Sequence, residues 1–306
     1  GKELALAMGL EMATARLGAS VAFFFSSAIA GGTSPDANPM KTVYFGLGLL
    51  CIGFLTFLTY VFMDAKLDKQ ESAHTSDEPA EEFRLSDLGK ILTNRGFLLI
   101  SLLCVLFYCG VFPFLKYAVN MMENRLGISN VAAGYISGLL PVGTIILTPI
   151  IGNYLDRKGK GASMMIYGAI LLTIAHLTFA LAPLNMALAI IAIMVLGVAF
   201  SLVPASMWPS VPKIVEDRYL GSAYALVFWI QNIGLWFIPW LIGAVLKAVN
   251  PGVYEKMQAG DPTATYNYTV PMLIFAALGI AAIFLGYLLK REDKRKNYGL
   301  ELPNKS

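Results

Sequence analysis

Charged side chains are scarce in this sequence. Only 14% of its 306 residues are Asp, Glu, Lys or Arg, whereas 57% are hydrophobic. A soluble domain carries about 25% charged residues, so these side chains are too few to cover a water-exposed surface. The deficit excludes a soluble enzyme, a disordered chain and a nucleic-acid-binding protein. The net charge of +3 gives no reason to expect a polyanionic partner.

Cysteine is also scarce, and so are acidic residues within the apolar stretches. Cys51, Cys104 and Cys109 all lie in apolar stretches, which excludes a secreted disulfide scaffold and predicts buried thiols. The apolar stretches also lack a group of His, Asp and Glu residues that could form a catalytic dyad or hold a metal. We therefore expect no enzyme, no cofactor and no metal site.

Long apolar runs are abundant. A bilayer core of about 30 Å requires roughly 20 apolar residues per helix, and the sequence contains eight such runs. They predict an all-α polytopic membrane protein with a lipid bilayer as its main partner. The predicted spans cover about 4–30, 42–63, 96–120, 131–154, 162–183, 186–212, 221–246 and 269–290.

The basic residues predict the orientation of these spans. Of the 23 Lys and Arg residues, 17 fall on the side of the N-terminus, five fall on the other side and Arg16 lies within a span. Because cytoplasmic loops are enriched in Lys and Arg, both ends of the chain are expected in the cytoplasm, with a bacterial plasma membrane as the expected location. The polar stretch 64–90, with a short amphipathic piece at 83–88, predicts a solvated linker.

The loop 152–161 carries the most specific motif, Gly-Asn-Tyr-Leu-Asp-Arg-Lys-Gly-Lys-Gly. It resembles the G-x-x-x-D-R-x-G-R-[RK] signature of the major facilitator superfamily, with a degenerate end. The resemblance implies gating roles for Gly152, Asp156, Arg157 and Gly159. In the family the acidic residue docks on the N-terminus of a neighbouring helix, where a carboxylate is favoured by up to about 1 kcal/mol. The alternative is a positive turn that only sets topology.

Shorter strings narrow the resemblance to one branch of the superfamily. They are Ala15-Arg16-Leu17-Gly18, Val111-Phe112-Pro113-Phe114, Trp208-Pro209, Leu220-Gly221-Ser222-Ala223-Tyr224 and Gln231-Asn232-Ile233-Gly234. This branch includes the lysosomal dipeptide transporter of animals and its bacterial relatives. The resemblance implies twelve helices, alternating access and a small peptide or amino-acid-like substrate.

The expected organisation follows from a weak internal repeat. At an offset of 216 residues the first span resembles the seventh, as it would if six helices separated two equivalent positions. The chain is therefore expected to hold helices five to twelve, with four helices preceding it. We expect the end of one half at 1–63, a linker at 64–92, the second half at 93–292 and a tail at 293–306.

Arg16 is the foremost candidate for substrate binding. It lies about 18 Å along its span, where a charge requires a cavity or a partner. A guanidinium can bind a carboxylate through two parallel hydrogen bonds, so Arg16 could hold a substrate carboxylate. It could instead pair with an acidic residue in the preceding helices. Glu11 lies on a different face of the same helix and could bind a substrate ammonium or simply contact water.

Amide and aromatic side chains complete the candidate set. Gln231 and Asn232 could bind the backbone of a peptide or bond to a neighbouring helix. Trp229, Trp208 and Tyr108 could line a pocket or pack against helices.

The resulting expectation is a secondary transporter of small zwitterionic solutes, with dipeptides or amino-acid-like compounds as the substrates that the family branch implies. Spans two to eight hold no Asp or Glu in their cores, which favours a uniporter over proton coupling. The alternatives are a proton-coupled exporter of drugs or organic anions and a scaffold that does not transport. The sequence does not identify an accessory subunit.

Overall fold

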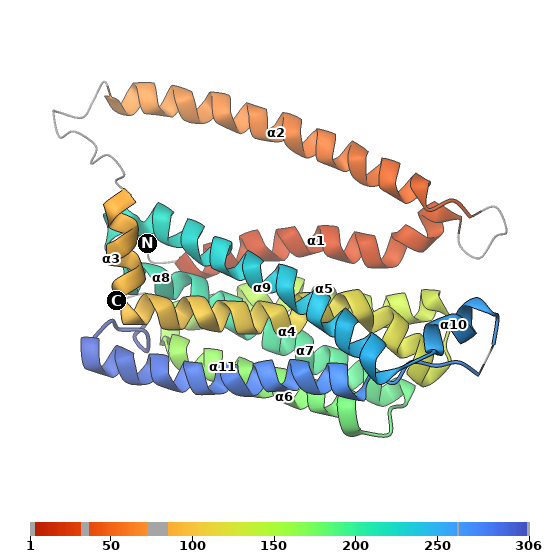
Figure 1. Ribbon diagram of the computed structural model, residues 1–306. Helices are drawn as coiled ribbons and strands as arrows, with labels where there is room; N and C mark the ends of the chain where they lie inside the picture. The colour runs from red at the N-terminus through yellow and green to blue at the C-terminus, as the bar shows by residue number, and fades with distance from the viewer. Residues whose placement is uncertain (1–3, 32–36, 73–84, 262, 305–306) are drawn as a thin grey trace. The chain divides into compact units, whose positions relative to one another are not determined.

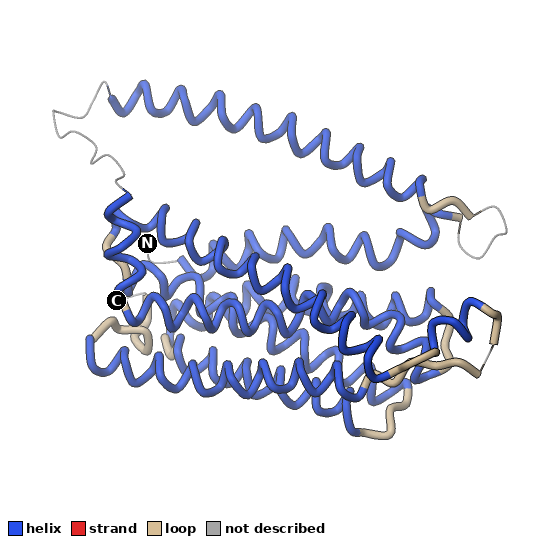
Figure 2. Tube along the Cα trace, in the orientation of Figure 1, coloured by secondary structure: helices blue, strands red, loops and turns tan. Residues whose placement is uncertain are grey.

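The computed structural model describes residues 4–31, 37–72, 85–261 and 263–304. Within these residues the chain forms helices joined by loops, without a strand (Figure 2). Residues 73–84 of the predicted linker lie outside the described residues. The chain divides into two compact units, 1–23 with 85–306, and 24–84.

The larger unit contains the candidate site. Its helices include the first part of α1 and a bundle in which α4 contacts α5, α9 and α11, while α6 packs between α7 and α11 (Figure 1). The elements are α1 (Leu4–Ala30), α3 (Leu85–Thr93), α4 (Arg95–Leu126), α5 (Asn130–Lys158), α6 (Gly161–Leu181), α7 (Met186–Met207), η1 (Trp208–Ser210), α8 (Val211–Ile214), η2 (Asp217–Tyr219), α9 (Leu220–Val249), α10 (Val253–Gln258) and α11 (Thr269–Lys296).

The smaller unit holds the end of α1 and all of α2 (Met40–Ser72). Cys51 is exposed on α2, whereas Cys104 and Cys109 are buried in α4. The prediction of three buried thiols is therefore wrong for Cys51. An apolar run alone predicts that a helix prefers a non-aqueous environment, and does not specify whether protein or lipid surrounds each side chain.

Each of the eight predicted spans corresponds to a long helix. Seven of the described helical segments are long and apolar enough to cross a membrane by length and composition: 40–67, 95–126, 130–158, 161–181, 186–214, 217–249 and 269–296. The eighth predicted span, α1, is a 27-residue helix that is not among those seven. It carries Glu11 and Arg16, and its length of about 40 Å still exceeds a bilayer core.

The sequence explains several helix ends. Asn94 Oδ1 accepts hydrogen bonds from the N–H groups of Gly96 and Phe97 and so caps the start of α4. Gly127 ends the same helix with a φ of 64°, a conformation that glycine adopts without steric cost. The side chain of Arg125 donates to the carbonyl oxygens of Phe179 and Ala182 at the end of α6. These contacts fix the register of α4 against its neighbours.

Candidate functional site

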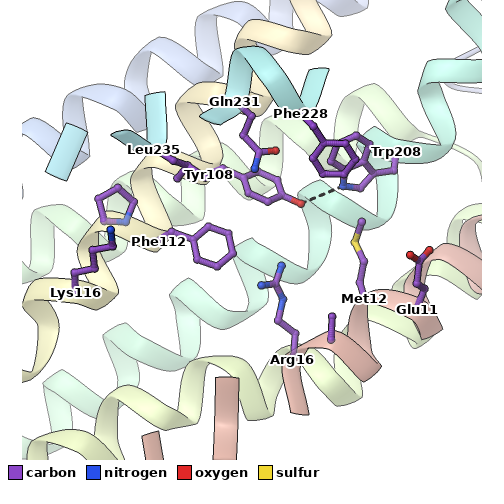
Figure 3. A pocket seen from close by; sticks show the side chains of 12 residues that line it. Glu11, Met12, Arg16, Tyr108, Phe112, Lys116, Trp208, Phe228, Gln231 and Leu235 are labelled. Carbon is purple, nitrogen blue, oxygen red and sulfur yellow. Dashed lines mark hydrogen bonds between the residues drawn. The ribbon is translucent and has the colours of Figure 1, made fainter. Parts of the chain in front are cut away.

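A cavity of about 500 Å³ opens between α1, α4, η1 and α9. Its volume falls in the range of small-molecule binding sites. Figure 3 shows aromatic rings and three charged side chains, Glu11, Arg16 and Lys116, around the cavity. The lining residues are Glu11, Met12, Ala15, Arg16, Tyr108, Phe112, Pro113, Lys116, Trp208, Phe228, Gln231 and Leu235.

Helical spacing brings these side chains together. Tyr108, Phe112 and Lys116 are four residues apart and therefore lie along one face of α4. The same rule places Met12 and Arg16 one turn apart on α1. Trp208 lies in η1, the 3-10 turn that follows α7, and its side chain forms part of the cavity wall. Three long helices and one short one therefore contribute to a single cavity.

The Arg16 guanidinium lies against aromatic rings. Its central carbon is 4.5 Å from the ring centroid of Phe200 and 5.0 Å from that of Phe112. Such contacts stabilise a cation through the negative faces of the rings. Within the described residues no carboxylate lies within 4.0 Å of Arg16. The guanidinium is thus held in place without neutralisation, and its donors remain available on the cavity side.

Two hydrogen bonds fix the polar part of the wall. Trp208 Nε1 donates to the Tyr108 hydroxyl over 3.1 Å (Figure 3). On α9, Gln231 Oε1 accepts from Cys104 Sγ over 3.1 Å, which fixes one end of the amide. No described residue accepts a hydrogen bond from Gln231 Nε2, so this donor is available to a ligand.

The charges in the cavity are separated along its length. Figure 3 shows Lys116 at one end, Glu11 at the other and Arg16 between them. A ligand with both an anionic and a cationic group therefore meets complementary charges at different places. The cavity's electrostatics suit a zwitterion, and the two cations also suit an anion.

Five of the seven predicted binding residues line this cavity: Glu11, Arg16, Tyr108, Trp208 and Gln231. The structure does not bring Trp229 or Asn232 to it. A helix turns by about 100° per residue, so neither neighbour shares the face of Gln231. Trp229 is exposed, and Asn232 donates to the carbonyl of Phe228 within its own helix.

Some lining residues were missed by the sequence reasoning. Lys116 and Phe112 line the cavity but are not among the predicted binding residues. The signal that could have found both is their spacing of four residues from Tyr108. Phe228, which lines the cavity, and Phe200, which contacts Arg16, give no such signal, because α7 and α9 are apolar on most faces.

The predicted gating loop forms a second polar site. Asp156 is buried, and its two carboxylate oxygens accept from the N–H groups of Ala5 (3.1 Å) and Leu6 (2.8 Å) in the first turn of α1. Asn304 Nδ2 also donates to Asp156 Oδ1 over 2.8 Å. A carboxylate that accepts three hydrogen bonds at a helix N-terminus is well stabilised there.

Two glycines of the loop permit close backbone contact. A Cβ atom at Gly152 would lie 2.5 Å from the carbonyl oxygen of Ala5, so α5 and α1 could not approach as they do. Gly159 has a φ of 72° and lies against Leu302 and Pro303. The side chain of Arg157 is exposed. The motif's glycines and carboxylate therefore make structural contacts, whereas its arginine faces outward.

The described residues contain no group of three or more His, Cys, Asp or Glu side chains that could hold a metal. His176 is buried among aromatic rings and has one hydrogen bond, between Nε2 and the carbonyl of Gly110. Its Nδ1 atom has no partner in the described chain.

Comparisons with known proteins find several relatives of this chain. The lysosomal dipeptide transporter MFSD1 of Bos taurus is 28% identical over 256 residues, which are 80% of this chain and 53% of that protein. The human protein of the same name is 28% identical over 258 residues, covering 81% and 53%. An uncharacterised protein of Archaeoglobus fulgidus is 28% identical over 249 residues, covering 79% of this chain and 99% of that protein.

This chain thus spans about half the length of the mammalian relatives. The family description of the Major Facilitator Superfamily matches residues 1–239 and 115–301, which together cover nearly the whole chain. Long apolar helices, a cavity between them that holds charged side chains and the Asp156 loop agree with that match. The chain belongs to the major facilitator superfamily of membrane transporters.

Proposed function

We propose that this chain carries the binding site of a uniporter that moves small zwitterionic solutes, dipeptides or amino-acid-like compounds, by alternating access. The observation that carries the proposal is the unneutralised Arg16 guanidinium in a cavity that also holds Glu11. The names of the mammalian relatives add dipeptides as the first substrate class to test.

In the proposed complex the substrate lies along the row of charges. Arg16 binds its carboxylate through two parallel hydrogen bonds, and Glu11 binds its ammonium group. Gln231 Nε2 donates to a peptide carbonyl. Backbone groups are common to all dipeptides, so these contacts accept many side chains, which the aromatic wall of Tyr108 and Trp208 accommodates.

The Asp156 loop is proposed as the gate on the cytoplasmic side. Its carboxylate holds the start of α1 against α5, and separation of these helices would open the cavity to the cytoplasm. In this proposal Gly152 allows the close contact between α1 and α5, Gly159 allows the loop to pack against Leu302 and Pro303, and Arg157 is exposed. Both ends of the chain are proposed to be cytoplasmic, on the basis of the 17-to-5 distribution of basic residues, and the membrane is proposed to be a bacterial plasma membrane.

One observation favours a second candidate, an exporter of organic anions or drugs driven by protons. Lys116 lines the same cavity as Arg16, and two cations against one carboxylate would also attract an anion without an ammonium group. In this alternative Glu11 would carry the proton.

Uptake into proteoliposomes tests the binding roles. We compare a dipeptide with its C-terminal amide and its N-acetyl derivative, in the wild type and in Arg16→Gln. The wild type should prefer the free acid over the amide by at least about tenfold, the value of one charge-assisted pair. Arg16→Gln should lose this preference and keep its preference for a free amino group. Lys256→Gln, which removes an exposed charge in α10, serves as the control.

The same assay separates the two candidates. Dipeptide uptake that continues after the pH gradient is collapsed supports uniport. Efflux of lipophilic anions that requires the gradient, without dipeptide uptake, would establish the exporter. An Arg16→Gln protein that still prefers the acid by the wild-type ratio would refute the proposed carboxylate contact.

A further inference from the structure

A second cavity lies where α4 begins and α11 ends. Its volume is about 520 Å³, and its lining is dominated by cationic side chains from the two helix ends. Figure 1 shows these ends side by side in the larger unit. We call this the basic cavity; it is lined by Arg95, Leu288, Arg291, Glu292, Lys294 and Arg295.

Glu292 is the one carboxylate in the lining of the basic cavity. Its side chain is only 5% exposed, and it contacts Arg295 over 2.5 Å and Arg95 over 3.9 Å. It thereby orients one arginine from each helix. Within the described chain Arg291 and Lys294 have no carboxylate within 4.0 Å. Four cations and one carboxylate leave about three positive charges uncompensated.

Basic residues at this position have simpler explanations. Cations in the last turn of a helix are favoured by its dipole, and Lys and Arg in such segments set membrane orientation. Neither explanation requires the charges of two helices to converge on one cavity, nor a buried carboxylate that orients two of them. This convergence distinguishes the basic cavity from a merely positive surface.

An exposed apolar stripe on α11 leads into the basic cavity. Ile280, Phe284 and Tyr287 are 57%, 63% and 62% exposed. Their spacing of four and three residues continues to Arg291 and Lys294, so all five lie on one helical face. A ligand on this face meets apolar side chains along the helix and cations at its end.

We propose that the basic cavity binds the headgroup phosphate of an anionic phospholipid whose acyl chain lies along the Ile280–Phe284–Tyr287 stripe. Guanidinium groups bind phosphate oxygens in pairs, and basic pockets between membrane helices suit such headgroups. The excess of about three positive charges fits a headgroup with two phosphates, such as cardiolipin, better than one with a single phosphate.

Native mass spectrometry of the delipidated protein tests the proposal. Cardiolipin, phosphatidylglycerol and phosphatidylcholine are titrated separately, and inorganic pyrophosphate serves as a phosphate source without acyl chains. The test variant is Arg291→Gln with Lys294→Gln, because both side chains are exposed and their removal breaks no ion pair in the described chain. The control is Lys66→Gln with Lys69→Gln, which removes the same charge from exposed positions of α2.

We expect saturable cardiolipin binding that exceeds phosphatidylglycerol binding, with phosphatidylcholine weakest. The test variant should bind cardiolipin about 30-fold more weakly, roughly fivefold for each charge removed, while the control stays within about twofold. Equal weakening in both variants would show diffuse surface attraction and overturn the site. Pyrophosphate binding as tight as cardiolipin binding would overturn the lipid assignment, because the stripe would then contribute nothing.

Discussion

At the scale of single residues, the cavity depends on a few buried polar contacts. The Tyr108 hydroxyl accepts from the indole nitrogen of Trp208, and both side chains are buried. Arg16 lies against the rings of Phe112 and Phe200, and Phe200 also packs on Tyr108. Loss of one hydroxyl would therefore affect the wall that positions the guanidinium.

Tyr108→Phe should destabilise the protein by about 1–3 kcal/mol. The substitution removes the acceptor but leaves the buried Trp208 N–H without a partner, and the cost of an unsatisfied buried donor has this size. The thermal midpoint of the detergent-solubilised protein should fall, and the KM for a transported solute should rise. Tyr167→Phe, on an exposed face of α6, provides the control. An unchanged midpoint for Tyr108→Phe would show that the hydrogen bond contributes no stability.

How far the sequence predicts the site depends on the kind of residue. An arginine within an apolar run is unusual enough to identify Arg16, and a family motif identifies Asp156. Aromatic and amide residues are common in such helices, so Gln231 could be predicted while its neighbour Asn232 could not be excluded. Lys116 is not predicted, because its place in the cavity depends on its alignment with Tyr108 on one face of α4. Only the packing of three helices decides which face is the cavity wall.

At the scale of helices, the sequence predicts which long helices form better than it predicts where each helix ends. Runs of apolar residues identified every long helix, since lipid requires their backbone groups to be bonded internally. The predicted span 42–63 ended earlier than α2, which continues to Ser72, because polar residues also form helix beyond a bilayer. The predicted span 186–212 instead divides into α7, η1 and α8 near Pro209. Hydropathy does not report either feature.

The contact between α1 and α5 leads to a prediction for Gly152→Ala. The added Cβ would lie 2.5 Å from the Ala5 oxygen and 2.9 Å from its carbonyl carbon, and these backbone atoms cannot give way. The helices should separate at the Asp156 end. Distances between spin labels at exposed Leu10 and Lys158 should therefore shift to longer values.

Gly143→Ala is the matched control in the same helix, because no heavy atom lies within 4 Å of its added Cβ. It should leave the label distances unchanged and stabilise α5 by up to about 1 kcal/mol, the helix preference of Ala over Gly. Similar label distances in both variants would show that close approach at Gly152 does not hold α1 against α5.

At the scale of the larger unit, the last described segment connects several helices. After α11 ends at Lys296, the N–H groups of Lys160 and Gly161 donate to the carbonyls of Glu301 and Leu300. Lys213 Nζ donates to the carbonyls of Gly299 and Leu302. The segment 297–304 thus packs on the Asp156 loop, and the side chain of Asn304 donates a hydrogen bond to Asp156.

The segment also reaches the start of α4. The Tyr298 hydroxyl donates to Asn94 Oδ1, the same oxygen that caps α4. A phenol is protonated at neutral pH, and burial raises the pKa of Tyr298 further from that range, so its hydroxyl keeps its role as a donor. Helices α4, α5, α6 and α11 are therefore joined at this end by one short segment, which favours their movement as one body.

Glu301→Ala tests whether this segment secures that end of the bundle. The Glu301 carboxylate accepts from the N–H and hydroxyl of Ser163 over 2.8 Å each and lies 3.5 Å from Lys290 Nζ. Hydrogen bonds to a charged group contribute about 1.5–3 kcal/mol, and partial exposure places the expected loss of folding free energy near the lower value.

Hydrogen exchange in Glu301→Ala should rise in 160–163 and 299–304 together, because each segment holds the other. Glu255→Ala removes an exposed carboxylate from α10 and should change neither segment. Faster exchange confined to 299–304 would mean that the α6 N-terminus is ordered independently and that the segment does not couple these helices.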